Sequence, residues 1–177
     1  MNNKLTATIK FLVISLCLAT FSLTANAQKK KPTTPKKPPT AAVATGNTEI
    51  KAGAEKVSIQ IKNVSKFIYI LGGVAKGIED IDKEAKTGKV KREILDQNAQ
   101  FKQSVIKSIQ NLRAGLVALE IEFRTKPSLK NYLFQINGVS DLAGNAEDQA
   151  ARGQFNEAGK TLLFVIEKLS DTLVALP

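Results

Sequence analysis

The chain has 177 residues, and its 26 basic and 16 acidic side chains give a formal net charge of +10 at pH 7. It contains no histidine or tryptophan, and its single cysteine is Cys17. This composition excludes histidine- or thiolate-based zinc and di-iron sites, Ser-His-Asp and Cys-His nucleophiles, c-type haem attachment and an internal disulfide. We therefore expect a protein that is not an enzyme and that holds no cofactor.

The segment 1–27 has the pattern of an export signal. Lys4 and Lys10 precede an apolar run, and small residues follow it up to Ala27, as a signal peptidase requires. Two alternatives remain, an uncleaved membrane anchor and lipidation at Cys17. The apolar run is short for a membrane span of about 20 residues. We therefore predict cleavage after Ala27 and an exported product that is periplasmic or secreted.

Residues 28–46 differ in composition from the rest of the chain, with five lysines, four prolines and no acidic residue. Proline favours extended polyproline II and like charges repel one another, so this segment is predicted to be a disordered basic arm. Such an arm serves either as a spacer or as an electrostatic tether to a polyanion. The lysines that would bind the polyanion are Lys29, Lys30, Lys31, Lys36 and Lys37.

Beyond the arm, apolar residues recur every three or four positions, which indicates α-helices. The first helix ends near Gly88, Pro127 starts the third, and Gly153 closes it. The side chains expected in the core are Ile50, Ala54, Val57, Ile61, Val64, Ile68, Leu71, Ala75, Ile78 and Ile81 in the first helix; Ile94, Phe101, Val105, Ile109, Leu112, Leu116, Leu119 and Phe123 in the second; Leu129, Leu133, Ile136, Val139, Leu142 or Ala143, and Ala146 in the third; and Phe155, Ala158, Leu162, Ile166, Leu169, Leu173 and Leu176 in the fourth.

These four helices predict an all-α domain over residues 47–177. Short connections between successive helices favour an antiparallel up-down-up-down four-helix bundle. The first two helices are predicted to be longer than the last two, so the first helical hairpin should project beyond the second. Residues 82–100 carry few large apolar groups, as expected for a hairpin end that leaves the core.

The end of this first hairpin is strongly cationic. Residues 83–92 contain one acidic residue, Glu84, and five basic residues. The basic residues are Lys83, Lys86, Lys89, Lys91 and Arg92. We refer to these five basic residues as the hairpin tip. They form either a solvated end that aids solubility or a contact for a polyanion.

Glycines interrupt the helical pattern at two places. Gly72, Gly73 and Gly77 lie inside the first helix, where each costs about 1 kcal/mol relative to alanine, and could kink it. Gly115 and Gly138 are predicted to lie level with each other, which would let the second and third helices approach closely. Close packing is the preferred interpretation, with a small ligand cavity as the alternative.

Carboxylates near the end of the first helix are the remaining candidates for chemistry. Glu79, Asp80, Asp82 and Glu84 could hold a divalent cation loosely, but the interleaved lysines favour solvated ion pairs, so we predict no metal site. The same four-residue spacing and the same interpretation apply to Glu120 with Arg124 and to Glu122 with Lys126.

Two classes of function are compatible with these features. The first is a noncatalytic interaction module of the cell envelope or secreted space, which binds an anionic envelope polymer, anionic lipid or protein partner through the arm and the hairpin tip. The second is a periplasmic holdase-like chaperone for unfolded envelope proteins. We expect no small-molecule substrate and no nucleic-acid partner. The oligomeric state does not follow from the sequence.

Overall fold

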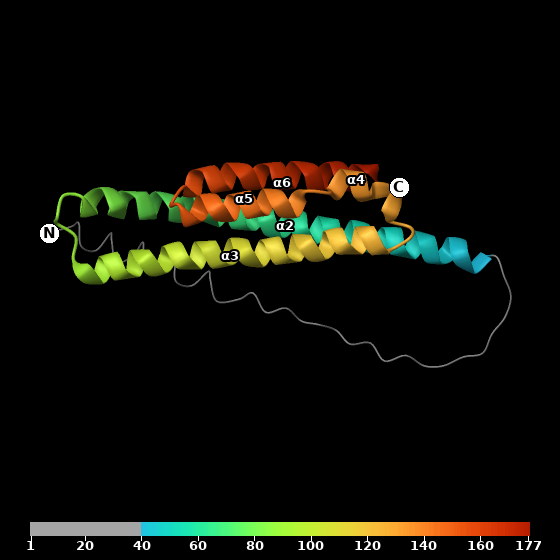
Figure 1. Ribbon diagram of the computed structural model, residues 1–177, viewed down its shortest axis with the longest axis horizontal. Helices are drawn as coiled ribbons and strands as arrows, with labels where there is room; N and C mark the ends of the chain where they lie inside the picture. The colour runs from blue at the N-terminus through green and yellow to red at the C-terminus, as the bar shows by residue number, and fades with distance from the viewer. Residues whose placement is uncertain (1–39) are drawn as a thin grey trace, which may run out of the picture. The chain divides into compact units, whose positions relative to one another are not determined.

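The computed structural model describes the backbone of residues 40–177 and the side chains from residue 46 onward (Figure 1). Its four main helices are α2 (Thr40–Ala85), α3 (Arg92–Thr125), α5 (Val139–Ala151) and α6 (Phe155–Ala175). This part of the chain contains no strand, so the all-α prediction is confirmed for it. The predicted export signal and the five arm lysines lie outside the described residues.

The first helix begins earlier than the composition predicts. α2 starts at Thr40, whereas the predicted arm extends to residue 46. The last proline of the arm is Pro39, and three of the next five residues are alanines. Alanine has the highest helix propensity, so the helix extends back as far as the prolines allow. Residues 40–46 of the predicted arm are therefore helical.

The two predicted glycine stops are confirmed. Gly88 has φ of +70° and Gly153 has φ of +77°, in the left-handed region that glycine adopts without strain. The amide of Gly88 donates to the Ala85 carbonyl, and the amide of Gly153 donates to the Ala150 carbonyl, both in short turns at helix ends. These glycines reverse the chain between α2 and α3 and between α5 and α6.

The predicted third helix is broken into pieces. The chain forms a 3-10 turn, η1 (Lys130–Tyr132), then the single helical turn α4 (Leu133–Ile136), and only then α5. Gly138 separates α4 from α5 with φ of +92°. The apolar spacing continues across this break, which is why the sequence pattern alone suggests one continuous helix.

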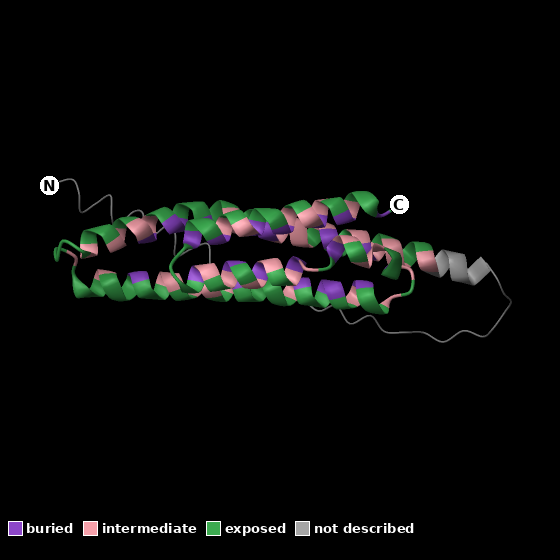
Figure 2. Cartoon of the chain, turned by 45° about the horizontal axis from the view of Figure 1, so that its top comes forward, coloured by how far each residue is buried: buried purple, intermediate pink, exposed green. Residues whose placement is uncertain are grey.

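The four main helices contact one another in a closed cycle. α2 packs against α3 and α6, and α5 packs against the same two helices, while the short α4 also packs on α6. The helices lie side by side along their lengths in Figure 1. Figure 2 shows the buried residues as stripes along the helices, which is the pattern expected for amphipathic helices that share one core.

The core contains most of the predicted apolar residues. Phe123, Leu116 and Leu162 are among its fully buried side chains. Val165 and Thr172 are also buried, although the predicted set does not include them. Leu133 and Leu142 are partly exposed, and Ala143 takes the buried position instead. The buried apolar residues are Val57, Val64, Leu71, Val74, Ala75, Ile78, Val105, Ile109, Leu112, Leu116, Leu119, Phe123, Leu129, Ile136, Val139, Ala143, Ala146, Ala150, Phe155, Ala158, Leu162, Val165, Leu169 and Leu176.

The predicted contact between two glycines is wrong. A Cβ atom on Gly115 would lie 3.0 Å from Nε2 of Gln60 in α2, whereas a Cβ atom on Gly138 would meet nothing within 4 Å. Gly115 therefore makes room for the Gln60 side chain, and Gly138 serves the backbone turn before α5. α2 continues as one helix through its own internal glycines. Within residues 40–177, no helix combines the length and the apolar character needed to cross a bilayer.

Candidate functional site

The hairpin tip lies on a defined turn. After α2 ends, the amide and the hydroxyl of Thr87 both donate to the Glu84 carbonyl, at 3.0 Å and 2.7 Å. The amides of Ile94 and Leu95 then donate to the Lys91 carbonyl at 3.0 Å and 3.2 Å and begin α3. These hydrogen bonds fix the backbone that carries the predicted basic residues.

All five basic side chains of the hairpin tip are exposed to solvent. None of them takes part in any of the ion pairs formed within the described part of the chain. Glu84 and Glu93, which adjoin the tip residues in sequence, are exposed as well, and Asp82, next to Lys83, is paired with Lys102. The structure therefore brings the five predicted residues together at one end of the α2–α3 hairpin, with their charges free to interact with an external anion.

A polar cluster supports the tip from inside the hairpin. Both carboxylate oxygens of Asp82 lie 2.8 Å from Nζ of Lys102, and Nδ2 of Asn98 donates to Oδ1 of Asp82 at 2.8 Å. Asn98 is 3% exposed and is the buried residue of the stretch 80–104. This cluster crosses from α2 to α3, holds the two helices together where the apolar core has ended, and neutralises Asp82 within the hairpin.

The end of the α5–α6 hairpin is located by two contacts. Asn156, in the first turn of α6, donates to Glu79 of α2. On α3, Nη1 of Arg113 lies 3.1 Å from a carboxylate oxygen of Glu147 in α5. In Figure 1 the loop between α2 and α3 lies farther along the helices than the turn between α5 and α6.

The predicted acidic cluster is spread over different contacts. Glu79 binds Asn156, Asp82 binds Lys102 and Asn98, and Asp80 and Glu84 are exposed. Residues 40–177 hold no group of three or more acidic, cysteine or histidine side chains arranged to bind a metal ion. The expected pairing of Glu122 with Lys126 is confirmed.

The expected pairing of Glu120 with Arg124 is wrong. Glu120 is 8% exposed and accepts hydrogen bonds from the Gly138 amide at 2.7 Å and from the Ser140 amide at 3.3 Å, while the Ser140 hydroxyl donates to its second oxygen at 2.6 Å. A carboxylate at the first turn of a helix satisfies free amides there. Glu120 thus joins α3 to the start of α5. Its role was hidden in the sequence, because its partners lie on another helix.

Glu122 joins three parts of the chain at the opposite end of α3 from the tip. Its carboxylate accepts hydrogen bonds from Lys126 and from Lys56 of α2. Burial raises the pKa of this carboxyl, but the hydrogen bonds and charges of Lys126 and Lys56 outweigh that effect, so its pKa lies below its ordinary value. The arrangement is that of a structural ion pair, because the two lysines neutralise the carboxylate.

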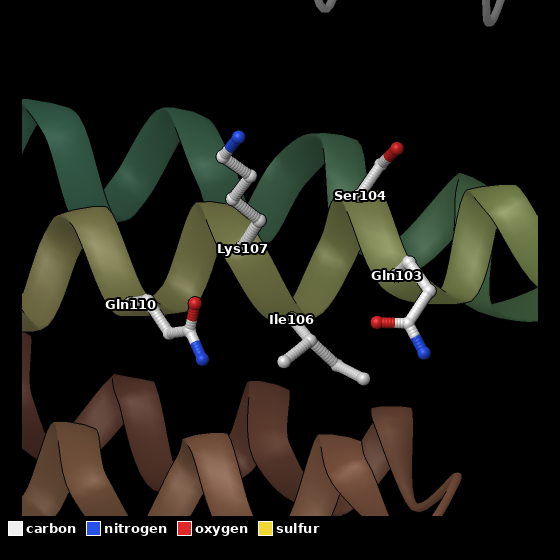
Figure 3. A pocket seen from close by; sticks show the side chains of 5 residues that line it. All are labelled: Gln103, Ser104, Ile106, Lys107 and Gln110. Carbon is white, nitrogen blue, oxygen red and sulfur yellow. The ribbon is translucent and has the colours of Figure 1, made fainter.

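An open hollow lies on α3 beside the end of α5 (Figure 3). Its lining residues are Gln103, Ser104, Ile106, Lys107 and Gln110. Figure 3 shows Gln103, Ile106 and Gln110 pointing toward the C-terminal helices and Lys107 pointing away from them. Gln110 already donates to Glu147 at 2.8 Å. The hollow contains one ionisable group and no pair of groups suited to acid-base chemistry.

The cationic end of the α2–α3 hairpin is thus the site that the geometry supports most directly. No protein-family model, no curated protein sequence and no solved structure matches this chain.

Proposed function

We propose that this chain is a noncatalytic exported protein of the cell envelope or secreted space that binds an anionic surface or partner through the hairpin tip and the basic arm. The observation that carries the proposal is the tip itself: five exposed basic side chains without ion pairs, on a hydrogen-bonded turn. Unpaired surface charges of one sign attract polyanions over a distance of about 8 Å at physiological ionic strength.

The architecture proposed with this function is an antiparallel up-down-up-down bundle whose first hairpin projects. The cycle of contacts among α2, α3, α5 and α6 supports it, as do the short turns at Gly88 and Gly153. The position of Asn156 beside Glu79 supports the projection, because the part of α2 beyond Glu79 then has no α6 residue beside it. A projecting cationic end would reach an anionic surface without disturbing the core.

Export is part of the proposal and is supported by the signal-like sequence before Gln28. Intact-mass analysis of the protein recovered from its native cells should give an N-terminus at Gln28 and no lipid. A product that retains Met1, or one that begins at a lipidated Cys17, would contradict this part of the proposal.

Binding is tested by sedimentation with vesicles that contain phosphatidylglycerol and phosphatidylcholine, and by titration with soluble polyphosphate. Replacing the five tip residues with glutamine should weaken vesicle binding by about 1 kcal/mol for each residue that nears the surface. Replacing the five arm lysines is expected to have a similar and roughly additive effect. Binding should also fall as salt rises.

The matched control removes the same charge from elsewhere. Its five exposed basic residues, all replaced by glutamine, are Lys107, Arg124, Lys130, Arg152 and Lys160. This control should bind much more tightly than the tip variant, and both should keep the helical circular dichroism of the parent. Equal loss in the two variants, or binding that does not respond to salt, would contradict a specific role for the tip.

The alternative function, a periplasmic holdase, predicts a different result. A holdase suppresses aggregation of an unfolded outer-membrane protein at roughly equimolar amounts. We expect no such suppression under conditions in which the vesicles sediment the protein. Stoichiometric suppression without vesicle binding would replace the surface-binding proposal with the holdase.

A further inference from the structure

A second cationic surface runs along the outer side of α2. Residues spaced by three and four lie on one side of a helix, and six such residues of α2 are all exposed. They are Ile59, Lys62, Lys66, Tyr69, Gly73 and Lys76. Beyond Lys76, the same side of the helix carries exposed Asp80 after one turn and Lys83 of the hairpin tip after two.

The charge of this surface is positive. The same three-and-four spacing also includes exposed Glu55 and Asp80, but these are outnumbered on that side of the helix by Lys51, Lys62, Lys66, Lys76 and Lys83. Lys62, Lys66 and Lys76 take part in none of the ion pairs of the described chain. Lys56, by contrast, is paired with Glu122 of α3, on another side of α2. The three free lysines therefore point away from the carboxylates that stabilise the fold.

The same surface carries apolar side chains in contact with solvent. Tyr69 is 87% exposed and Ile59 is 51% exposed. A Cβ atom on Gly72 or Gly73 would meet nothing within 4 Å, so the backbone next to Tyr69 is bare. Each of these glycines costs about 1 kcal/mol relative to alanine within a helix. No packing contact in the fold accounts for that cost.

α6 extends this surface on one flank. A Cβ atom on Gly159 would lie 3.5 Å from Cδ2 of Leu71, so the side of α6 that carries Gly159 faces α2. Leu163 lies one turn beyond Gly159 on that side, and Val174 follows three turns later. Leu163 is 52% exposed and Val174 is 86% exposed. We call these eight residues, the six of α2 with Leu163 and Val174, the α2–α6 face.

We infer that the α2–α6 face docks on the surface of an anionic lipid bilayer. Free lysines are attracted to anionic headgroups, and Tyr, Ile, Leu and Val side chains gain free energy by leaving water at the headgroup boundary. Glu167 and Asp171, which lie between Leu163 and Val174 on α6 and are exposed, reduce the positive excess by two charges and leave it positive.

Other occupants fit this face less well. A second copy of the chain would bring two rows of lysines together, which like-charge repulsion opposes. A soluble polyanion would neutralise the lysines but would leave Tyr69 and Val174 in water. The bilayer surface satisfies both the charge and the apolar groups. This inference rests on the proposed function, because it requires an anionic surface. It identifies that surface as a lipid bilayer and adds the α2–α6 face as a second contact besides the hairpin tip.

The chain has no tryptophan, so a single Tyr69→Trp substitution in the full exported protein gives an unambiguous fluorescent probe. With vesicles of phosphatidylglycerol and phosphatidylcholine, we expect a blue shift of its emission and quenching by brominated lipid. The control is Ile121→Trp, at a residue on α3 that is 51% exposed, compared with 87% for Tyr69. Its emission should stay unchanged. Equal blue shifts of the emission at both positions would overturn the inference. So would the absence of a blue shift for Tyr69→Trp under conditions in which the vesicles sediment the protein.

The lysines are tested by the triple variant K62Q, K66Q and K76Q. At about 1 kcal/mol per lysine near the membrane, the vesicle affinity should fall about 100-fold. The control K107Q, R124Q and K130Q should lose less than about tenfold. Equal losses in the two triple variants would contradict the assignment. Sedimentation of the free protein gives a further test. Stable dimers that are altered by the lysine substitutions would assign the face to a second copy and would contradict the membrane assignment.

The two contacts fail in distinguishable ways. The tip variant that also carries Tyr69→Trp should retain the blue shift at vesicle concentrations high enough to restore binding. If vesicle binding depends on the tip while the tryptophan stays in water, the face inference is wrong and the proposed function stands. If the tryptophan enters the lipid and the tip variant binds like the parent, the face inference stands and the role proposed for the tip is wrong.

Discussion

The packed bundle and the distal hairpin, residues 80–104, are held together by different interactions. In the bundle, all four main helices contribute fully buried apolar side chains such as Val64, Leu116 and Leu169. In the distal hairpin, the buried residue is Asn98, and the Asp82 cluster connects α2 to α3. The proposed binding end is thus held by other interactions than those that stabilise the bundle, so the tip can vary without loss of the fold.

The largest expected effect comes from the bundle core. Leu116→Ala or Leu169→Ala should destabilise the protein by about 2 to 5 kcal/mol, because each removes a side chain that is 0% exposed and leaves a cavity. Ile94→Ala in the distal hairpin, where the side chain is partly exposed, should cost about 1 kcal/mol or less. Chemical denaturation measures all three. Equal losses at Ile94 and Leu116 would remove the distinction between the two regions.

The buried carboxylate of the bundle should have the next largest effect. Glu120→Gln keeps the shape of the side chain but removes its charge and one acceptor for the Gly138 and Ser140 groups, so we expect a loss of about 1 to 3 kcal/mol. Ser140→Ala in the Glu120→Gln background should then cost less than it does alone, because the two residues share a hydrogen bond. Additive losses in this double-mutant cycle would contradict the coupling.

The polar cluster should affect the distal hairpin selectively. Asp82→Asn weakens the contacts to Lys102 and Asn98 and should cost about 1 kcal/mol. Amide hydrogen exchange should accelerate over residues 80–104 while protection in the bundle changes little, since local opening and global unfolding are separate events. Uniform acceleration along α3 would show that the two regions unfold as one.

The smallest effect depends on pH. The pKa of Glu122 is lower in the folded protein than its ordinary value of 4.5, so its ionised form stabilises the fold above that value. This contribution should disappear as the pH falls through the lowered folded pKa. Because Lys56 is 51% exposed, the total is about 1 kcal/mol or less. The stability difference between the parent and Glu122→Gln should be present at pH 7 and should shrink as the pH falls below 4.5.

Much of the fold can be predicted from the sequence, and the predictions that fail do so for local reasons. The three-and-four spacing of apolar residues identifies the helices, and Gly88 and Gly153 correctly mark two turns. The break at Gly138 does not follow, because the spacing continues across it and its acceptor, Glu120, lies on α3. The start of α2 at Thr40 is missed because composition places the alanines with the preceding prolines.

One part of the candidate binding surface could be predicted from the sequence, and another part could not. The tip residues lie together because they are close in sequence, and any turn at Gly88 gathers them. The α2–α6 face was not predicted, although the spacing of Lys62, Lys66 and Tyr69 in the sequence already places them on one side of a helix. The contribution of α6 could not be predicted, because it requires knowing that Gly159 faces Leu71.

The hydrogen bond between Asn156 and Glu79 has a consequence for the order of folding. Its partners are 77 residues apart, whereas Glu120 and the Gly138 amide are 18 apart. The longer loop is about two doublings of the shorter one, so its closure costs about 1.2 kcal/mol more in chain entropy. We expect α3 and α5 to pair early and α6 to dock on α2 late. Substitutions between α2 and α6 should then mainly speed unfolding and leave the refolding rate nearly unchanged.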